Sequence, residues 1–157
     1  MTEPRVLSSF ELVEMSTTLP EVVLKEGLDW TNITFKGRGF AWINHPENRA
    51  MIKTHHDERQ ALLATAPAVY EAGWATNSSA WVRVRLELAD PEEIVELLEE
   101  AWRMTATKRA IKAYDNDTAF PLIAPMLGPD TAILTLQNGV DSVAELSKRY
   151  GERAVIG

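Results

Sequence analysis

The chain has 157 residues, of which 45% are hydrophobic and 25% are charged, and its formal net charge is −7 at pH 7. This composition predicts an ordered globular chain, either one domain or one small domain with an appendage. The absence of cysteine excludes disulfides, thiolate catalysis and the commonest structural zinc sites. The acidic balance weighs against extensive contacts with nucleic-acid phosphates, although a local basic patch is compatible with it.

No membrane segment is expected, because no stretch approaches the roughly 18 consecutive apolar residues that a transmembrane helix requires. The N-terminal residues also lack the apolar core of a secretion signal. We therefore expect a cytoplasmic protein.

The first predicted helix covers residues 8–15. Ser8 and Glu11 have the spacing of a capping box, in which two side chains satisfy backbone N–H groups at a helix start. Leu19 precedes Pro20, and a residue before proline avoids helical dihedral angles, so the helix should have ended by that point.

Three short strands are expected next, over residues 30–35, 40–44 and 50–53. These segments are rich in β-branched, aromatic and apolar residues. Turn-forming residues at 36–39 and 45–48 separate them. Connections this short predict an antiparallel meander.

A second helix should begin with Thr54 as its cap and Asp57 three residues further on. A brief strand over residues 68–71 and a polar loop over 73–79 are expected after it. Of the five tryptophans, Trp74 in that loop is the one that we expect to be most exposed.

The longest predicted strand and helix lie together in residues 80–112. Apolar residues alternate with polar or aromatic ones over 81–88, which is the period of a strand with one buried face. Asp90 is a suitable helix cap and Pro91 suits the first helical position. One face of the predicted helix is apolar; its residues are Ile94, Leu97, Leu98, Ala101 and Met104.

The last part of the chain has a different pattern. We expect a helix over residues 117–126, an almost wholly apolar strand over 131–136, a helix over 141–150 and a strand over 154–156. A strand that is apolar at every position is typical of parallel sheets, and this order is typical of a doubly wound fold.

Residues 1–112 are therefore predicted to form a two-layer α+β domain, an antiparallel sheet with helices on one face. The expected order is helix, three strands, helix, two strands, helix, and residues 113–157 form an α-β-α-β appendage. Parallel strands need covered faces and neighbouring strands. We expect the appendage to dock on the first domain, to be partly disordered, or to pair with a second copy in a homo-oligomer.

Several motifs follow one another along residues 10–112. They are Leu19-Pro20-Glu21, Lys36-Gly37-Arg38-Gly39-Phe40-Ala41, a helix over Asp57 to Leu63, Trp81-Val82-Arg83-Val84, and a closing helix over Leu97 to Arg103 with Lys108-Arg109. In this order and spacing the segment resembles the MmcQ/YjbR family, described as having a double-wing DNA-binding-like fold. The resemblance implies the fold and a non-catalytic module that binds DNA.

A second group of motifs covers residues 112–157. They are Lys112-Ala113-Tyr114-Asp115, Leu127-Gly128-Pro129-Asp130-Thr131, Leu136-Gln137-Asn138-Gly139 and Val155-Ile156-Gly157. This segment resembles a truncated, Rossmann-like piece of ketopantoate reductase, which reduces 2-dehydropantoate with NADPH. The resemblance implies that Lys112 contacts the NADP cofactor and that Asn138 contacts cofactor and substrate.

The sequence lacks the other parts of such an enzyme. Gly37-Arg38-Gly39 has no third glycine of a dinucleotide-binding loop and falls in a predicted hairpin. The helical domain that carries the family's catalytic lysine has no counterpart. We therefore expect no catalytic residue and no bound cofactor, with NADP as the cofactor only if the reductase resemblance is functional.

One set of residues is a candidate nucleic-acid site. Cationic side chains on predicted strands and turns, next to a tryptophan, would contact a phosphate backbone without reading its sequence. The set consists of Lys36, Arg38, Arg49, Lys53, Trp81, Arg83 and Arg85, with Trp42 as a further stacking residue. The alternative is a solvated sheet face with cross-strand ion pairs, such as Arg85 with Glu71.

Three functions follow from these patterns: a DNA-binding module, an NADP-dependent reductase fragment, and a protein–protein adaptor that uses the sheet face. No metal site is expected, because the adjacent His55 and His56 at a helix start have no third ligand nearby in sequence. His45, which precedes Pro46 in a turn, is expected to be exposed.

Overall fold

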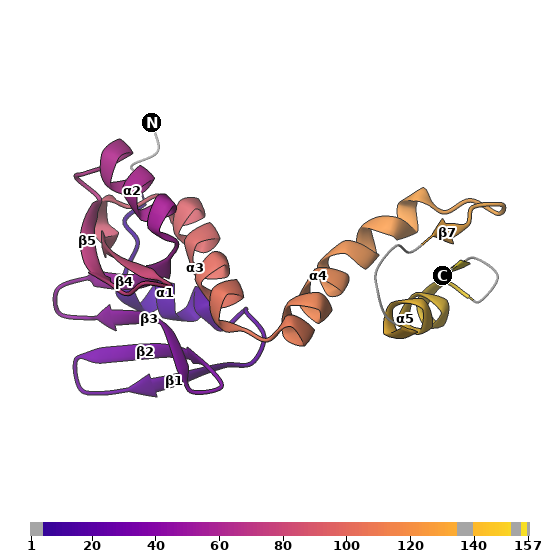
Figure 1. The fold of residues 1–157 in the computed structure, drawn as a ribbon, viewed down its shortest axis with the longest axis horizontal. Coiled ribbons are helices and arrows are strands. Elements are labelled where there is room, and N and C mark those ends of the chain that lie inside the picture. The colour runs from indigo at the N-terminus through magenta and orange to yellow at the C-terminus, as the bar shows by residue number, and fades with distance from the viewer. Residues whose placement is uncertain (1–4, 135–139, 152–154, 157) are drawn as a thin grey trace. The chain divides into compact units, whose positions relative to one another are not determined.

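A computed structural model describes residues 5–134, 140–151 and 155–156 (Figure 1). The chain divides into two compact units, residues 1–107 and 108–157. None of the helices in the described ranges is long and apolar enough to cross a membrane.

The first unit is a six-stranded sheet with three α-helices. The strand order is β1-β2-β3-β4-β6-β5, and every neighbouring pair is antiparallel. The strands are β1 (Val22–Glu26), β2 (Trp30–Phe35), β3 (Arg38–Asn44), β4 (Arg49–Thr54), β5 (Tyr70–Ala75) and β6 (Ala80–Arg85). The helices are α1 (Ser9–Ser16), α2 (His56–Thr65) and α3 (Pro91–Thr105).

The helices cover one face of this sheet and thereby confirm the predicted α+β class. α3 packs on β3 and β4, α2 on β5 and β6, and α1 on β2 and β3. The inward-facing strand residues are fully buried; they include Ile33, Phe35, Ile43, Ile52, Val82 and Val84. Their partners on the helices include Leu12, Leu62, Ile94 and Leu98.

Several local signals act as the sequence predicts. Ser8 Oγ accepts a hydrogen bond from the Glu11 N–H at 3.2 Å, and Glu11 Oε2 accepts one from the Ser8 N–H at 2.9 Å. Asp90 caps α3 by accepting from the Glu92 N–H at 3.0 Å. The two-residue turn between β2 and β3 has positive φ at Lys36 and Gly37, as a tight hairpin requires.

Other predictions are wrong in detail. β1 was not expected, because Val22, Val23 and Leu24 do not alternate with polar residues and β1 lies at the sheet edge. The strand predicted to reach residue 88 ends at Arg85. A 3₁₀ turn over Leu86–Leu88 then buries Leu86 completely and leaves Leu88 55% exposed.

Two helix boundaries also differ from the prediction. Thr54 does not cap α2, because it pairs with Ala80 as the last residue of β4. α2 begins at His56 instead, and the side chain of His55 makes no capping bond. The long helix expected through residue 112 stops at Thr105, where Ala106 adopts extended dihedral angles.

The turn between β3 and β4 fastens α1 to the sheet. His45 is half-buried rather than exposed; its Nδ1 lies 2.9 Å from Ser9 Oγ and its Nε2 lies 2.8 Å from Thr31 Oγ1. The ring of Phe10 stacks on His45 with the centroids 4.4 Å apart. Asn48 accepts a hydrogen bond from the Ser9 N–H at 2.8 Å.

The second unit contains α4 (Lys108–Ile123), a 3₁₀ turn (Ala124–Met126), β7 (Ile133–Leu134), α5 (Val140–Tyr150) and β8 (Val155–Ile156). β7 and β8 are parallel and α5 connects them in sequence. The helix predicted from residue 117 begins nine residues earlier, at Lys108. Residues 135 and 136 of the predicted strand lie outside the described residues.

Contacts between α4 and α5 hold this unit together. Phe120 and Leu146 are buried, and the guanidinium of Arg149 lies 5.3 Å from the centroid of the Phe120 ring. Arg149 also lies 3.1 Å from Asp117 Oδ1, and the Tyr150 hydroxyl donates to the Phe120 carbonyl.

Trp102 anchors α3 to the segment that leads into β1. Its side chain is 0% exposed, its Nε1–H donates to the Pro20 carbonyl at 3.0 Å, and it meets Phe35 edge to face at 6.2 Å. Replacing Trp102 with Phe removes this hydrogen bond and leaves a cavity. We expect W102F to lower the free energy of unfolding by about 2 kcal/mol in urea titrations followed by far-UV circular dichroism.

The matched control is W74F, because Trp74 is 62% exposed. We expect its free energy of unfolding to stay within about 0.5 kcal/mol of the original. Equal effects of the two substitutions would contradict the anchoring role of Trp102.

Candidate binding face of the sheet

The face of the sheet opposite the helices, called the outer face below, carries the candidate site. Strand register places its residues: Arg49 lies opposite Arg85, Met51 opposite Arg83, and Lys53 opposite Trp81. Side chains alternate along a strand, so the side chains of these six residues point to the face opposite the buried ones. The buried residues of the two strands are Ala50, Ile52, Val82 and Val84. The outer face therefore gathers the cations of β4 and β6.

Carboxylates accompany most of these cations. Arg49 Nη1 lies 2.7 Å from Glu87 Oε2. Arg85 forms an ion pair with Glu71, and Arg83 lies 4.0 Å from the same carboxylate. The cross-strand pair of Arg85 with Glu71, foreseen as the alternative to a binding site, is thus present.

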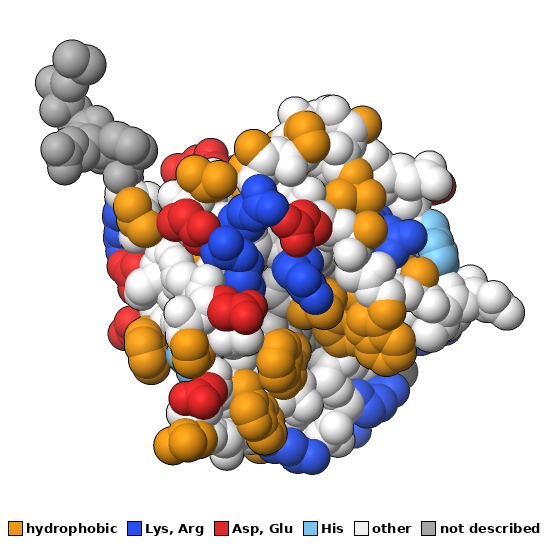
Figure 2. Space-filling model, turned by 90° about the vertical axis from the view of Figure 1, so that its left-hand side faces the viewer, with side chains coloured by type: hydrophobic (Ala, Val, Ile, Leu, Met, Phe, Trp, Pro, Cys, Tyr) orange, Lys and Arg blue, Asp and Glu red, His pale blue; other side chains and the backbone are white. Residues whose placement is uncertain are grey.

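Lys53 differs from its neighbours, since no carboxylate of the described chain lies within ion-pair distance of it. This part of the face therefore has four cations and two carboxylates, Glu71 and Glu87. The cations are Arg49, Lys53, Arg83 and Arg85. Figure 2 shows one side of the molecule on which positive and acidic side chains intermingle beside hydrophobic ones.

Glu87 is held as a carboxylate by its surroundings. Its partial burial raises the pKa, but a backbone hydrogen bond and the guanidinium of Arg49 act in the opposite direction, and the net effect is a lowered pKa. The lowered pKa favours the carboxylate form of Glu87, which pairs with the Arg49 guanidinium.

Lys36 and Arg38 do not join this cluster. They lie at the β2–β3 turn, whereas Arg49 lies beside Asn44 at the other end of β3. Lys36 Nζ lies 3.4 Å from Glu21 Oε1. The centroid of the Phe35 ring lies 5.6 Å from Lys36 Nζ and 5.9 Å from Arg38 Cζ. The seven predicted residues thus form a strand group and a separate turn group.

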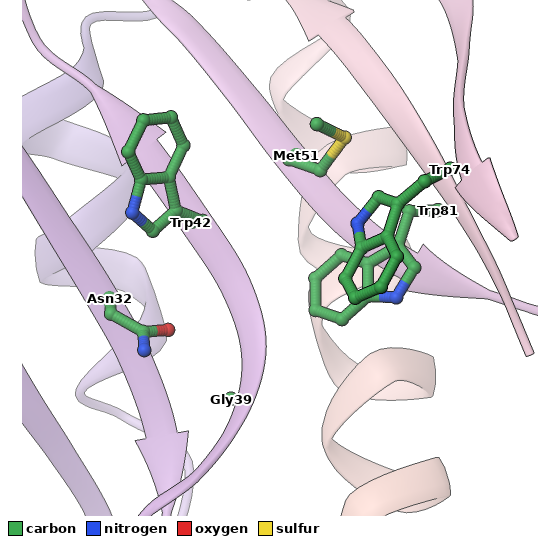
Figure 3. Close-up of a pocket in the computed structure, with 6 residues that line it drawn as sticks. All are labelled: Asn32, Gly39, Trp42, Met51, Trp74 and Trp81. Atoms are coloured by element: carbon green, nitrogen blue, oxygen red, sulfur yellow. The ribbon is translucent and has the colours of Figure 1, made fainter. Parts of the chain in front are cut away.

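An aromatic hollow lies next to the strand cations (Figure 3). Its volume is about 380 Å³. Five strands supply its lining, which consists of Asn32, Gly39, Trp42, Met51, Trp74 and Trp81. We call it the tryptophan hollow.

Two walls of the tryptophan hollow are aromatic. The indoles of Trp74 and Trp81 are stacked, with centroids 5.8 Å apart and planes 16° from parallel. Trp42 stands across from this pair, and Met51 lies between the two sides (Figure 3). Trp42 is 39% exposed and Trp74 is 62% exposed, so large aromatic surfaces are open to solvent.

Two glycines lie in close contact with residues that line the tryptophan hollow. A Cβ at Gly73 would lie 2.6 Å from the Trp81 carbonyl oxygen and 2.7 Å from Met51 Sδ. A Cβ at Gly39 would lie 2.9 Å from Asn32 Oδ1. The backbone approaches closely at the first position, and the Asn32 amide occupies the space beside the second.

Sequence reasoning named Trp42 and Trp81 but missed Asn32, Gly39 and Met51 as lining residues. Trp74 was expected in a loop, and it is exposed as predicted, but it belongs to β5. The irregularity between Ala72 and Ala75 brings Trp74 over Trp81. The isolated glycine before Trp74 is the one signal in the sequence that points to such an irregularity.

The remaining candidate residues do not belong to the strand group or the turn group. His56 Nε2 contacts the Thr76 carbonyl at 2.8 Å. Across the described ranges, no three His, Asp or Glu residues are grouped so as to hold a metal ion. Lys112 lies in α4, and Asn138 lies outside the described residues.

Comparison with known families agrees with this architecture. The family model described as YjbR matches residues 17–104, which include all six strands of the sheet. The chain belongs to the YjbR family. The predicted resemblance of this segment is thereby confirmed.

The model described as ketopantoate reductase PanE/ApbA matches residues 109–157, as the motifs of that segment predicted. This match covers the second unit alone. Gly37-Arg38-Gly39, the nearest approach to a dinucleotide-binding loop, lies in the β2–β3 hairpin of the first unit.

A solved structure with a similar fold is the crystal structure of Deinococcus radiodurans protein DR2400, with domain DUF419. It is 18% identical, with a TM-score of 0.58 over 71% of this chain and 91% of that one. This likeness shows the fold alone. No curated protein matches the chain.

The close approach at Gly73 gives a test of the tryptophan hollow. We expect G73A to lower the free energy of unfolding by about 1–3 kcal/mol, because the Trp81 backbone must shift. It should also weaken the far-UV circular dichroism couplet of the stacked Trp74 and Trp81. G128A is the control, since its Cβ would meet only Thr131 Oγ1 at 3.4 Å; an unchanged couplet in G73A would contradict the arrangement.

Proposed function

We propose that the YjbR unit is a non-catalytic binding module whose outer face binds nucleic acid. The observation that carries the proposal is the placement of Lys53 and Arg83 directly beside accessible tryptophans. Cations contact phosphates and aromatic rings stack on bases, and proteins that bind single strands combine these two elements.

The ion pairs of the outer face are compatible with this role. Arg83, Arg85 and Glu71 are each more than a third exposed at the side chain, with values of 51%, 36% and 38%. Exposed ion pairs of this kind contribute about 1 kcal/mol or less. An arginine can therefore exchange Glu71 for a phosphate at small cost.

The net charge of −7 limits the strength of this binding. The four cations of the outer face exceed its two carboxylates by only two. We therefore expect few phosphate contacts and an affinity that depends only weakly on salt concentration. Such a module binds a short stretch of nucleic acid rather than a long duplex.

A second candidate, a reductase fragment, rests on the match of residues 109–157 and on the parallel pairing of β7 with β8. In this alternative, Lys112 contacts the NADP cofactor, as the resemblance of this segment implies. If the alternative holds, NADPH fluorescence will change on addition of protein, and K112A will abolish the change.

Removing cations and removing a carboxylate should have opposite effects on nucleic-acid binding. We expect K53A/R83A to weaken binding of a labelled single-stranded oligonucleotide about tenfold at 50 mM salt and to make the salt slope shallower by about 1.4. E71Q should strengthen binding about threefold, because it frees Arg83 and Arg85. Fluorescence anisotropy against salt concentration measures both effects.

Matched controls separate these effects from a change in total charge. K108A/K148A removes two exposed lysines from the second unit. E99Q removes a carboxylate that pairs with Arg103 on α3 at 2.9 Å. Equal behaviour of E71Q and E99Q, or no binding of single strands or duplexes at low salt, would overturn the proposal and favour a protein–protein adaptor.

A further inference from the structure

The tryptophan hollow has chemistry that phosphate contacts alone do not require. We propose that it binds one unpaired nucleobase of a single-stranded nucleic acid, held against its indole walls and hydrogen-bonded by Asn32. This inference rests on the proposed function and specifies which part of the nucleic acid enters the face.

The walls suit a flat aromatic group. Trp42 stands on one side and the stacked Trp74 and Trp81 on the other, with Met51 between them (Figure 3). Stacking of a base on an aromatic side chain contributes about 1–3 kcal/mol. A rigid planar group gains this energy with little loss of conformational freedom.

The volume of about 380 Å³ limits the size of the occupant. It lies at the lower end of the range of about 300–1,000 Å³ that is typical of small-molecule sites. This size suits one base with its sugar and leaves no room for a column of stacked bases.

Asn32 supplies the polar group that such an occupant needs. Its amide lines the tryptophan hollow, and its side chain has no hydrogen-bond partner in the part of the chain that the structure describes. A carboxamide offers two N–H donors and an oxygen acceptor, which can pair with the edge of a base. Gly39 has no side chain to displace this amide.

Two cations of the outer face lie next to the tryptophan hollow, where they can contact the phosphates of a bound strand. Lys53 lies directly opposite Trp81 in the strand register, and Arg83 lies opposite Met51. Both therefore lie next to lining residues, and an anionic ligand is favoured over a neutral aromatic compound.

The base must be unpaired. In a duplex, each base is covered by its neighbours and hydrogen-bonded on the edge that Asn32 would contact, and extracting it costs a few kcal/mol. A surface with few cations cannot offset that cost, so the face should prefer single strands to duplexes.

The test uses the full chain and three labelled probes of equal length: a single-stranded oligonucleotide, the same sequence as a duplex, and an abasic oligomer with the same phosphates. We expect the single strand to bind about tenfold more tightly than the abasic oligomer, since one base is stacked. It should also bind more tightly than the duplex and quench tryptophan fluorescence. Anisotropy and fluorescence titrations measure these differences.

Substitutions test whether the difference in affinity between the single strand and the abasic oligomer arises in the tryptophan hollow. W42A, N32A and G39A should weaken binding of the single strand and leave binding of the abasic oligomer unchanged, whereas K53A/R83A should weaken both. W30A is the matched control, because Trp30 is also 39% exposed but does not line the tryptophan hollow. Thermal unfolding of each variant verifies that it is folded.

The outcomes separate this inference from the proposed function. If the abasic oligomer binds as tightly as the single strand, the base site is wrong and the phosphate-binding face stands. If no probe binds, both are wrong. If an acidic peptide with a single tryptophan binds more tightly than the single strand, with the same loss in W42A, the hollow takes a protein side chain and the inference is overturned.

Discussion

The covering of one sheet face by three helices is the constraint on which the rest of the first unit depends. Side chains alternate along each strand, so burying Ile52 and Val82 on the inner face turns Met51, Lys53 and Trp81 outward. A shift of register by one residue would exchange the two sets and place cations in the core. The same packing that stabilises the fold therefore assembles the outer face.

The outer face combines cations that outnumber the carboxylates by two with aromatic surface that is open to solvent. The ion pairs of Arg49 and Arg85 reduce the positive potential without covering the tryptophans. An acidic protein with a surface of this kind avoids strong, unspecific attraction to any polyanion. Under the proposed function, selectivity comes from stacking and from the shape of the tryptophan hollow.

Much of the fold could be predicted because it is encoded over short distances. The capping box of Ser8 and Glu11, the cap at Asp90 and the apolar face of α3 are local patterns, and each appears as expected. The edge strand β1 carries no alternating pattern and was missed. The end of α3 at Thr105 was also missed, since no proline or glycine marks that point.

The sequence by itself determined the α+β class, the inward residues of the central strands, and the candidate cations Arg83 and Arg85, because strand and helix periods are read from neighbouring residues. Only the tertiary structure decided which side chains meet. Strand order joined β4 to β6, and an irregular β5 laid Trp74 over Trp81. Such contacts depend on register and packing between distant segments, and the period of a single segment does not contain that information.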